Sequence, residues 1–314
     1  MEAAALGRTR HLIPPFDRFA SFDRFVGVDW SGAGGRQYSG IAVAECRAGT
    51  DAPVLVQPPG RHWRRTDFVD WMAAQAAVQA GRGERLLVGI DCAFALPAPM
   101  AGALLGAYYS APALWAYIDA HSAEAEDFFG GPFAVHDSHR SHFWHDGPRP
   151  AGYAELHRAT EYACRAAGLG APESPLKLVG ARQVGKGGLA GMRVLHALKT
   201  RLGSRFAVWP FDPPGDADIV CIELYPRLFM KMGGHGNGKI RTLDALNRNL
   251  AALDADPYLD PAEMLVDHET DALVAAAGLR FIAGDRAVWA PAGLDALAIR
   301  AEGWIFGVTS SGPK

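Results

Sequence analysis

Two short apolar segments of the sequence each end in an aspartate, and this pattern constrains the fold more than any other feature. Residues 25–29 and 86–91 are both long enough for a buried strand and end in Asp29 and Asp91. A third apolar segment, 219–223, ends in a glutamate. A carboxylate at the end of a buried strand is costly unless a positive charge meets it. Several converging carboxylates are the usual means of holding a divalent metal ion.

The sequence from residue 25 to residue 91 predicts three antiparallel strands, a helix and a fourth strand. Residues 25–29, 39–45 and 54–56 are strand-like, and the short links between them favour antiparallel neighbours. A helix is predicted from Thr66, which can cap its first turn. Because the strand at 86–91 is reached through this helix, we expect it to run parallel to the first strand and beside it. Both strands then end at the same edge of the sheet, where open α/β sheets bind ligands.

The rest of the chain alternates between helical and strand-like segments. Apolar patterns predict helices at 97–125 in two pieces broken at Pro112, and at 153–167, 188–202, 243–253 and 268–282, with strands at 206–211, 219–224 and 304–308. The segment 131–150 is rich in proline, histidine and tryptophan and is predicted to be irregular. This order predicts an α/β fold in which helices flank a mixed central sheet.

The size and composition of the chain fit one large α/β domain. It has 314 residues, of which 49% are hydrophobic and 21% charged, and this is enough to bury a substantial core. We expect a flexible leader at 1–23 and a single domain at 24–310 with an insertion at about 125–215. The net charge of −3 excludes a protein that binds polyanions over its whole surface.

Neither a membrane span nor a disulfide framework is expected. The sequence has no segment of about 18 uncharged apolar residues, the length that a transmembrane helix needs. The four cysteines, Cys46, Cys92, Cys164 and Cys221, are far apart in the sequence. This spacing is typical of reduced thiols in an apolar core. We therefore expect a soluble protein of the cytoplasm, without a membrane partner.

Five short motifs, taken in their order, resemble a known family. They are F-V-G-V-D-W-S-G from Phe25, V-G-I-D-C-A-F-A-L-P from Val88, I-E-L-Y-P-R-L-F from Ile222, D-H-E-T-D-A-L-V-A-A-A-G from Asp267 and E-G-W-I-F-G-V from Glu302. In this order they look like domain-of-unknown-function family 429, whose members are regarded as predicted ribonuclease H-like nucleases. A three-stranded meander, a helix and a central parallel strand, with acids on the first and fourth strands, is also the layout of ribonuclease H-like folds.

The resemblance implies a ribonuclease H-like fold and four acidic site residues, Asp29, Asp91, Glu223 and Asp271. The run His268-x-x-Asp271 also resembles the helix start of Holliday-junction resolvases, in which a residue one turn before the last aspartate assists the metal site. Residues i and i+3 share a helical face, so His268 and Asp271 can act on one ligand. The implied reaction is phosphodiester hydrolysis with Mg²⁺ or Mn²⁺, for which carboxylates supply most of the metal ligands.

A second group of candidate residues lies in the irregular segment. His136, His139, His142 and His145 are spaced by three. A helix turns about 300° in three residues, so the first and fourth histidines would point in opposite directions, and a dedicated metal site is not favoured. We expect a loop beside the acidic site, in which His139, Arg140 and His142 contact a phosphate or substrate. A partly buried aromatic loop is the alternative.

Residues 174–211 contain seven basic residues and no acid: Lys177, Arg182, Lys186, Arg193, Lys199, Arg201 and Arg205. Such a run is typical of a track for nucleic-acid phosphates. Lys177, Arg182 and Lys186 are therefore the substrate-binding candidates. A solvated helix face is the alternative for Arg193, Lys199 and Arg201.

Together these features predict a metal-dependent phosphodiester hydrolase of the nuclease type, acting on nucleic acid or another phosphodiester. One alternative is a phosphotransferase of the actin–hexokinase type. Residues 29–32, Asp-Trp-Ser-Gly, faintly resemble its first phosphate turn, although residues 91–93 match the second turn poorly. The other alternative is a binding module that keeps the fold without the chemistry.

Overall fold

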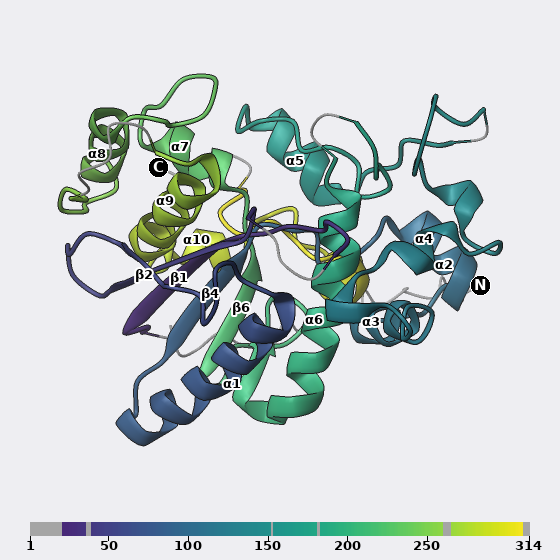
Figure 1. Cartoon of the computed structure of the whole chain (residues 1–314), viewed down its shortest axis with the longest axis horizontal. Coiled ribbons are helices and arrows are strands. Elements are labelled where there is room, and N and C mark those ends of the chain that lie inside the picture. The colour runs from purple at the N-terminus through teal and green to yellow at the C-terminus, as the bar shows by residue number, and fades with distance from the viewer. Residues whose placement is uncertain (1–20, 36–38, 152, 181–182, 260–264, 310–314) are drawn as a thin grey trace, which may run out of the picture.

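A six-stranded mixed sheet forms the centre of the molecule (Figure 1). The structure, a computed structural model, describes residues 21–35, 39–151, 153–180, 183–259 and 265–309, so the expected leader lies almost wholly outside it. The strands are β1 (Arg24–Asp29), β2 (Ala42–Arg47), β3 (Val54–Leu55), β4 (Leu86–Ile90), β5 (Phe206–Val208) and β6 (Ile219–Glu223). Their order across the sheet is β3-β2-β1-β4-β6-β5.

The strand directions confirm the predicted antiparallel meander and the predicted parallel neighbours. The β1–β2 and β2–β3 pairs are antiparallel, whereas the β1–β4, β4–β6 and β5–β6 pairs are parallel. In the register of the sheet, Val28 pairs with Ile90, and Ile90 pairs with Glu223. The carboxyl ends of β1, β4 and β6 therefore lie side by side at one edge of the sheet.

Helices cover both faces of the sheet. The α-helices are α1 (Arg65–Arg82), α2 (Ala98–Leu105), α3 (Ala111–Ala120), α4 (Gly131–Val135), α5 (Ala159–Ala166), α6 (Gly185–Leu202), α7 (Pro226–Met232), α8 (Leu243–Ala251), α9 (Asp267–Ile282) and α10 (Arg286–Trp289). Helix α9 lies on one face together with α7, α8 and α10, and α1 and α6 lie on the other (Figure 1). None of the described helices is long and apolar enough to cross a membrane.

The two faces of the sheet belong to two apolar cores, because successive side chains of a strand point to opposite sides. On β4, Val88 and Ile90 pack in the same core as Phe68 of α1. On β6, Val220 and Ile222 pack in the core on the α9 side. Strands buried on both faces are expected to be apolar along their whole length, and this explains the continuous apolar segments of the sequence. The four cysteines are buried and unbonded, as predicted.

Two predicted helix signals act differently from what we expected. Thr66 does not cap α1, since the helix already begins at Arg65. The carboxylate of Asp127 accepts hydrogen bonds from the backbone N–H groups of Arg65 and Thr66, at 3.1 and 2.8 Å. Pro112 does not break a helix, because it lies in the first turn of α3, where proline is well tolerated. The break comes earlier, where α2 ends at Gly106.

The predicted strand at 304–308 is wrong. This segment meets the sheet through one isolated bridge, between Glu223 and Ile305. Its apolar side chains, Trp304 and Phe306 among them, are buried in the core on the α9 side, so the pattern reflects burial and not strand pairing. Helix α5 also begins later than predicted, at Ala159. The short helices α7 and α10 were not predicted, since each is shorter than the window that reveals helical periodicity.

Helix α9 lies unusually close to β1 because small residues face each other across the interface. A Cβ atom built on Gly27 would come within 2.5 Å of the Ala272 carbonyl oxygen and the Ala276 backbone nitrogen, and within 2.7 Å of the Ala275 Cβ atom. Glycine in the strand and alanines in the helix thus let the two backbones approach. This close approach brings Asp271, in the second turn of α9, towards the carboxyl end of β1.

Replacing Gly27 with alanine is predicted to destabilise the fold by at least about 1–3 kcal/mol, the usual cost of overpacking a core. The added methyl group meets backbone atoms of α9, which cannot rotate away as a side chain can. Chemical denaturation measures the loss. Gly102→Ala in α2 is the matched control, since a Cβ atom there meets no atom within 4 Å. Equal stability of the two variants would contradict close packing of α9 on β1.

Candidate functional site

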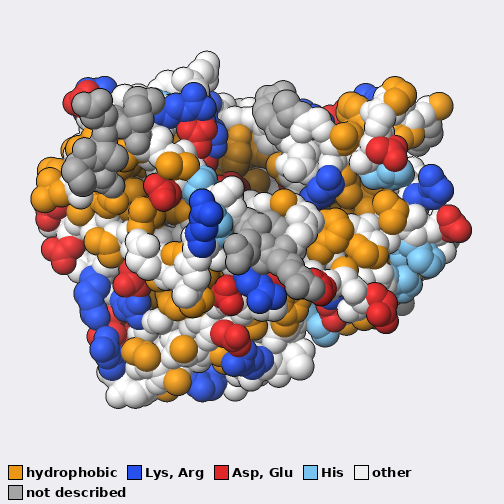
Figure 2. Space-filling view, in the orientation of Figure 1, with side chains coloured by type: hydrophobic (Ala, Val, Ile, Leu, Met, Phe, Trp, Pro, Cys, Tyr) orange, Lys and Arg blue, Asp and Glu red, His pale blue; other side chains and the backbone are white. Residues whose placement is uncertain are grey.

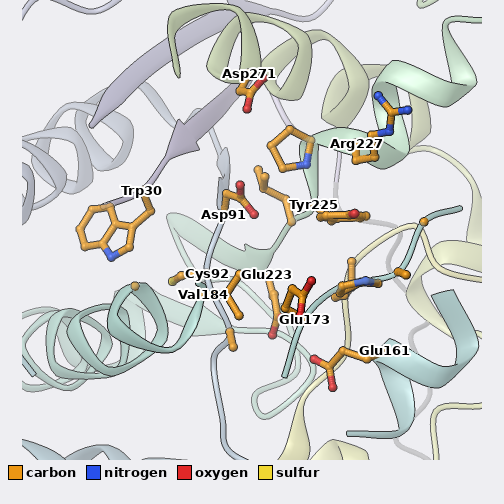
Figure 3. Close-up of a pocket in the computed structure, with 18 of the residues that line it drawn as sticks. Trp30, Asp91, Cys92, Glu161, Glu173, Val184, Glu223, Tyr225, Arg227 and Asp271 are labelled. Atoms are coloured by element: carbon orange, nitrogen blue, oxygen red, sulfur yellow. The ribbon is translucent and has the colours of Figure 1, made fainter. Parts of the chain in front are cut away.

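Three aspartates from separate parts of the chain meet at the carboxyl edge of the sheet. Asp29 is the last residue of β1, and Asp91 follows β4 directly. The Asp91 backbone N–H donates a 2.9 Å hydrogen bond to the Val28 carbonyl oxygen, which joins the two strand ends. The third acid, Asp271, comes from α9. Asp91 and Asp271 both point towards the middle of a pocket (Figure 3).

The pocket has a volume of about 680 Å³, within the usual range for a ligand site. Its walls come from the ends of β4 and β6, the first turn of α6, the segment 170–175, helix α7 and the segment 237–239. In the space-filling view the surface is hollowed between the region of α7 and that of α5 (Figure 2). Charged side chains of both signs line it, with Asp91, Asp271 and Glu173 among the acids and Arg227 among the bases.

Burial raises the pKa values of the three aspartates, and repulsion from neighbouring aspartates adds to the rise for Asp29 and Asp91. Burial raises the pKa of Asp29 well above its ordinary value, and the charges of Asp91 and Asp271 raise it further. The pKa of Asp91 rises from 3.8 to about 8, chiefly through burial and then through the charge of Asp271. Burial also raises the pKa of Asp271. The site therefore concentrates negative oxygen atoms that resist ionising together.

Lys239 supplies positive charge to this group of aspartates. Its Nζ donates a hydrogen bond to Oδ2 of Asp271. Burial alone would lower the pKa of Lys239, but the charge of Asp271, this hydrogen bond and the charges of Asp29 and Asp91 raise it. Oδ1 of Asp271 is buried and has no hydrogen-bond partner among the described residues. Half of the Asp271 carboxylate thus remains available to a ligand.

Glu223, the fourth predicted acid, is held in a different way. Its two oxygens accept hydrogen bonds of 2.5 and 2.8 Å from the Arg158 guanidinium, and a third bond of 3.0 Å comes from the Phe94 backbone N–H. Glu223 and Arg158 are both almost completely buried. The four acids were predicted to form one set, but the structure divides them into two groups. The three aspartates have Lys239 as their counter-charge, and Glu223 is paired with Arg158.

Arg158 is the centre of a buried charge network that joins three parts of the fold. Besides Glu223 it binds Glu161, through a hydrogen bond of 2.8 Å from its Nε to Oε1. Burial lowers the pKa of Arg158, but the charges of Glu161 and Glu223 outweigh this effect and raise it. The neighbouring Glu302 accepts hydrogen bonds from the backbone N–H groups of Ala98 and Ala159, at the starts of α2 and α5. The network fixes α5 against the end of β6.

The turn after Asp29 is held by buried Arg65. The guanidinium donates hydrogen bonds of 2.8–3.0 Å to the Ser31 carbonyl oxygen and one of 2.7 Å to that of Ala33. The first turn of α6 contacts the same turn closely, since a Cβ atom on Gly32 would lie 2.2 Å from the Gly187 nitrogen. The glycine at position 32 therefore lets α6 form one wall of the pocket.

The histidine-rich segment forms an aromatic cluster away from the pocket lining. His139 is fully buried, with Nδ1 2.8 Å from the Phe133 carbonyl oxygen and Nε2 3.2 Å from the Tyr117 hydroxyl. Burial lowers its pKa. Arg140 is exposed and pairs with Asp137 at 3.8 Å. Neither these residues nor His142, all of them within the described ranges, line the pocket. The segment matches the alternative of a partly buried aromatic loop.

The basic run at 174–211 does not form an open positive track in the described part of the chain. Its ion pairs are Lys177–Glu173 at 3.2 Å, Arg193–Asp119 at 2.7 Å, Lys199–Asp212 at 2.8 Å, Arg201–Asp70 at 2.5 Å and Arg205–Asp218 at 2.6 Å. Arg182 lies outside the described residues. Lys186 is partly buried in the first turn of α6. Most of these charges are therefore matched by acids from elsewhere in the fold.

The first turn of α9 carries two further candidates with different surroundings. Asp267 pairs with Arg241 through hydrogen bonds of 2.7 and 2.9 Å, and the hydrogen bond from Arg241 lowers the pKa of Asp267. His268 is partly exposed and lies close enough for its charge to act on Asp271. Asp267 is thus a surface ion-pair partner, while His268 lies beside the group of three aspartates.

The side chains as they lie do not form a finished metal site. Among the described residues, no group of three or more His, Cys, Asp or Glu side chains is arranged to hold a metal ion. The ion pairs above give the physical reason, because Lys239 lies against Asp271 and Arg158 holds Glu223. The chain matches no known family, curated protein or solved structure at a significant level.

Sequence reasoning missed the two bases that organise the site. Lys239 follows a glycine-rich segment, Gly233 to Gly238, and such a segment next to a pocket is a usable signal. Arg158 has only a weak local signal, an acid three residues later. Its main partner, Glu223, is 65 residues away in the chain.

Replacing Arg158 with methionine is predicted to destabilise the protein by about 3–5 kcal/mol, because Glu161 and Glu223 are left buried without a counter-charge. Arg241→Met is the matched control. It removes an exposed ion pair with Asp267 and should cost much less stability than the loss of Arg158. Urea unfolding of both variants tests this, and similar losses would contradict the central role of Arg158.

In protein free of divalent cations, stability is predicted to fall as the pH rises from about 4 to about 8. Asp91 has a pKa of about 8 in the folded chain, compared with an ordinary value of 3.8. The folded state therefore binds more protons than the unfolded state across this interval, and raising the pH favours unfolding. Asp29 and Asp271 act in the same direction.

Thermal unfolding in a chelating buffer, near both ends of this pH range, measures the effect. Asp91→Asn should reduce the fall in stability, because the amide does not ionise. Stability that rises with pH, or an unchanged pH dependence in the asparagine variant, would show that the pKa of Asp91 is not raised in the folded protein.

Proposed function

We propose that this protein is a divalent-metal-dependent phosphodiester hydrolase of the nuclease type, in which Asp29, Asp91 and Asp271 hold Mg²⁺ or Mn²⁺. The observation that carries the proposal is the convergence of these three acids, from β1, β4 and α9, at the carboxyl edge of the sheet, where Asp91 and Asp271 line a pocket of about 680 Å³. Their raised pKa values reflect burial and, for Asp29 and Asp91, repulsion from the neighbouring aspartates. A divalent cation bound between them would relieve this repulsion.

The proposal includes a ribonuclease H-like fold. Three features support it: the antiparallel β1–β2–β3 meander, the parallel placement of β4 beside β1 after α1, and the acids at the ends of β1 and β4. These are the features that the resemblance of the motifs implies. The expected insertion at about 125–215 covers the part of the chain that carries α4 to α6 and β5.

The donor atoms of the site suit Mg²⁺ and Mn²⁺. All three acids offer carboxylate oxygens, which these hard cations prefer over nitrogen or sulfur. Oδ1 of Asp271 supports the fit most directly, since it is buried without a hydrogen-bond partner among the described residues. A buried acceptor left in this way is costly, and a bound cation would remove the cost. Glu223, whose oxygens are bound by Arg158, is assigned to positioning β6 and α5 instead.

When bound, the metal ion makes a water molecule easier to deprotonate and stabilises the charge that develops on the phosphate. The residues of the chain have separate tasks around it. Asp29 and Asp91 are fixed by the register of β1 and β4 and orient the cation. His268, one turn before Asp271 and partly exposed, is the side chain suited to moving a proton to or from bulk solvent.

The substrate in this proposal is a nucleic acid or a related phosphodiester. Three bases from α7 and the segment that follows it also line the pocket: Arg227, Lys231 and Lys239. Their positive charges favour an anionic substrate on that side. These residues replace Lys177 as the main candidates for phosphate contact, because Lys177 does not line the pocket.

Asp29→Asn and Asp91→Asn are each predicted to reduce phosphodiester cleavage by more than about 100-fold. Mutating a residue that only hydrogen-bonds to a metal ligand already lowers metal affinity or activity by about 10–100-fold, and these two residues are proposed as ligands themselves. Cleavage of single-stranded DNA, RNA and bis(p-nitrophenyl) phosphate with Mg²⁺ or Mn²⁺ measures the loss. Asp267→Asn, in the first turn of α9, is the control, because Asp267 is paired with Arg241 at the surface.

Full activity in both asparagine variants would refute the assigned roles. A wild-type protein that binds neither Mg²⁺ nor Mn²⁺ at millimolar concentration would instead support a non-catalytic binding module.

A further inference from the structure

Lys239 has an unusual position between a buried acid and solvent. It lies outside the helices, in the segment between α7 and α8, and lines the pocket. Its ammonium group pairs with Asp271, whose side chain is 3% exposed, while its own side chain is 48% exposed. The charged end thus points into the site and the remainder faces solvent. The side chain can leave Asp271 without opening an apolar core.

The charge of Lys239 acts on all three aspartates of the site. It lowers the pKa values of Asp29, Asp91 and Asp271, so it is the counter-charge that the three acids share. Within the described part of the chain, the hydrogen bond of the Lys239 ammonium group is to Asp271. An ammonium group and a divalent cation repel each other strongly at contact distance where little water screens them. A cation bound at Oδ1 of Asp271 would therefore weaken the hold of the Lys239 ammonium group on Oδ2.

The backbone beside Lys239 is fixed, and this limits any displacement to the side chain. Arg227 of α7 donates hydrogen bonds to the carbonyl oxygens of Gly236 and Gly238, the latter at 2.8 Å, and to Oδ1 of Asn237 at 2.9 Å. Gly238 has a φ of +108°, a conformation that side chains other than glycine rarely adopt. Four rotatable carbons then separate a held backbone from a movable ammonium group.

We propose that Lys239 is an internal counter-ion that a divalent cation displaces from Asp271, so that Lys239 sets the cation affinity of the site. The inference rests on the proposed function, because it takes the three aspartates as cation ligands. In metal-free protein Lys239 stabilises the acids, and on cation binding its ammonium group leaves Asp271 and turns to solvent. The site is therefore preserved without metal but binds metal more weakly than three unopposed carboxylates would.

The test is calorimetric titration of the full-length, chelator-treated protein with Mn²⁺ alone. Lys239→Met keeps most of the side-chain volume and removes the charge. We expect it to bind Mn²⁺ at least about tenfold more tightly than wild type, because no cation has to be displaced. Metal-free Lys239→Met should also unfold at a lower temperature than wild type, and saturating Mn²⁺ should close this gap. Lys239→Gln should behave in the same way.

Lys231→Met is the matched control. Lys231 also lines the pocket, but its Nζ donates a 2.6 Å hydrogen bond to the Gly168 carbonyl oxygen and not to an aspartate. It should leave Mn²⁺ affinity unchanged.

The outcomes separate the inference from the proposed function. Equal or weaker Mn²⁺ binding by Lys239→Met, with measurable binding by wild type, would overturn the counter-ion role and leave the metal site standing. A tenfold gain in Lys231→Met as well would reduce the effect to general electrostatics and also overturn it. An absence of Mn²⁺ binding in wild type and in every variant would overturn the proposed function itself.

Discussion

The close approach of α9 to β1 is the constraint on which the site depends. The β1–β4 pairing brings Asp29 and Asp91 together, as the parallel register requires. Asp271 reaches them because Gly27 offers no side chain and α9 presents alanines, so that helix and strand pack backbone to backbone. A larger residue at the interface would lift the helix and move its acid from the strand ends. Packing of small apolar residues thus determines the local electrostatics.

Two neighbouring groups of acids are neutralised in opposite ways. Glu161 and Glu223 share Arg158, which is fully enclosed and permanently charged, so this network acts as a fixed part of the fold. The three aspartates have the half-exposed Lys239, whose side chain reaches in from the surface. A fixed counter-charge suits structure, whereas an exchangeable one suits a site that binds a cation. This difference leads us to assign Glu223 to structure and the aspartates to chemistry.

The elements set by local sequence were predictable, and those set by distant partners were not. Continuous apolar runs identified β1 and β4, and the helix between them required a parallel pair, so the meeting of Asp29 and Asp91 followed. The segment 304–308 has the same apolar pattern, yet burial beside the sheet and not strand pairing explains it. The basic run at 174–211 has an excess of positive charge in the sequence, but the fold pairs its bases with acids from other segments, such as Asp70 and Asp119. Arg158 joins the nearby Glu161 to Glu223, 65 residues away, and Lys239 acts on Asp271, 32 residues away.

The most direct test of the account is the anomalous scattering of a crystal soaked in Mn²⁺. We predict a peak at the carboxyl edge of the sheet, bounded by Asp29, Asp91 and Asp271, with the Lys239 side chain turned away from Asp271. A crystal in which Mn²⁺ is absent from this edge, while Lys239 remains on Asp271, would contradict the claim that these carboxylates form a cation site.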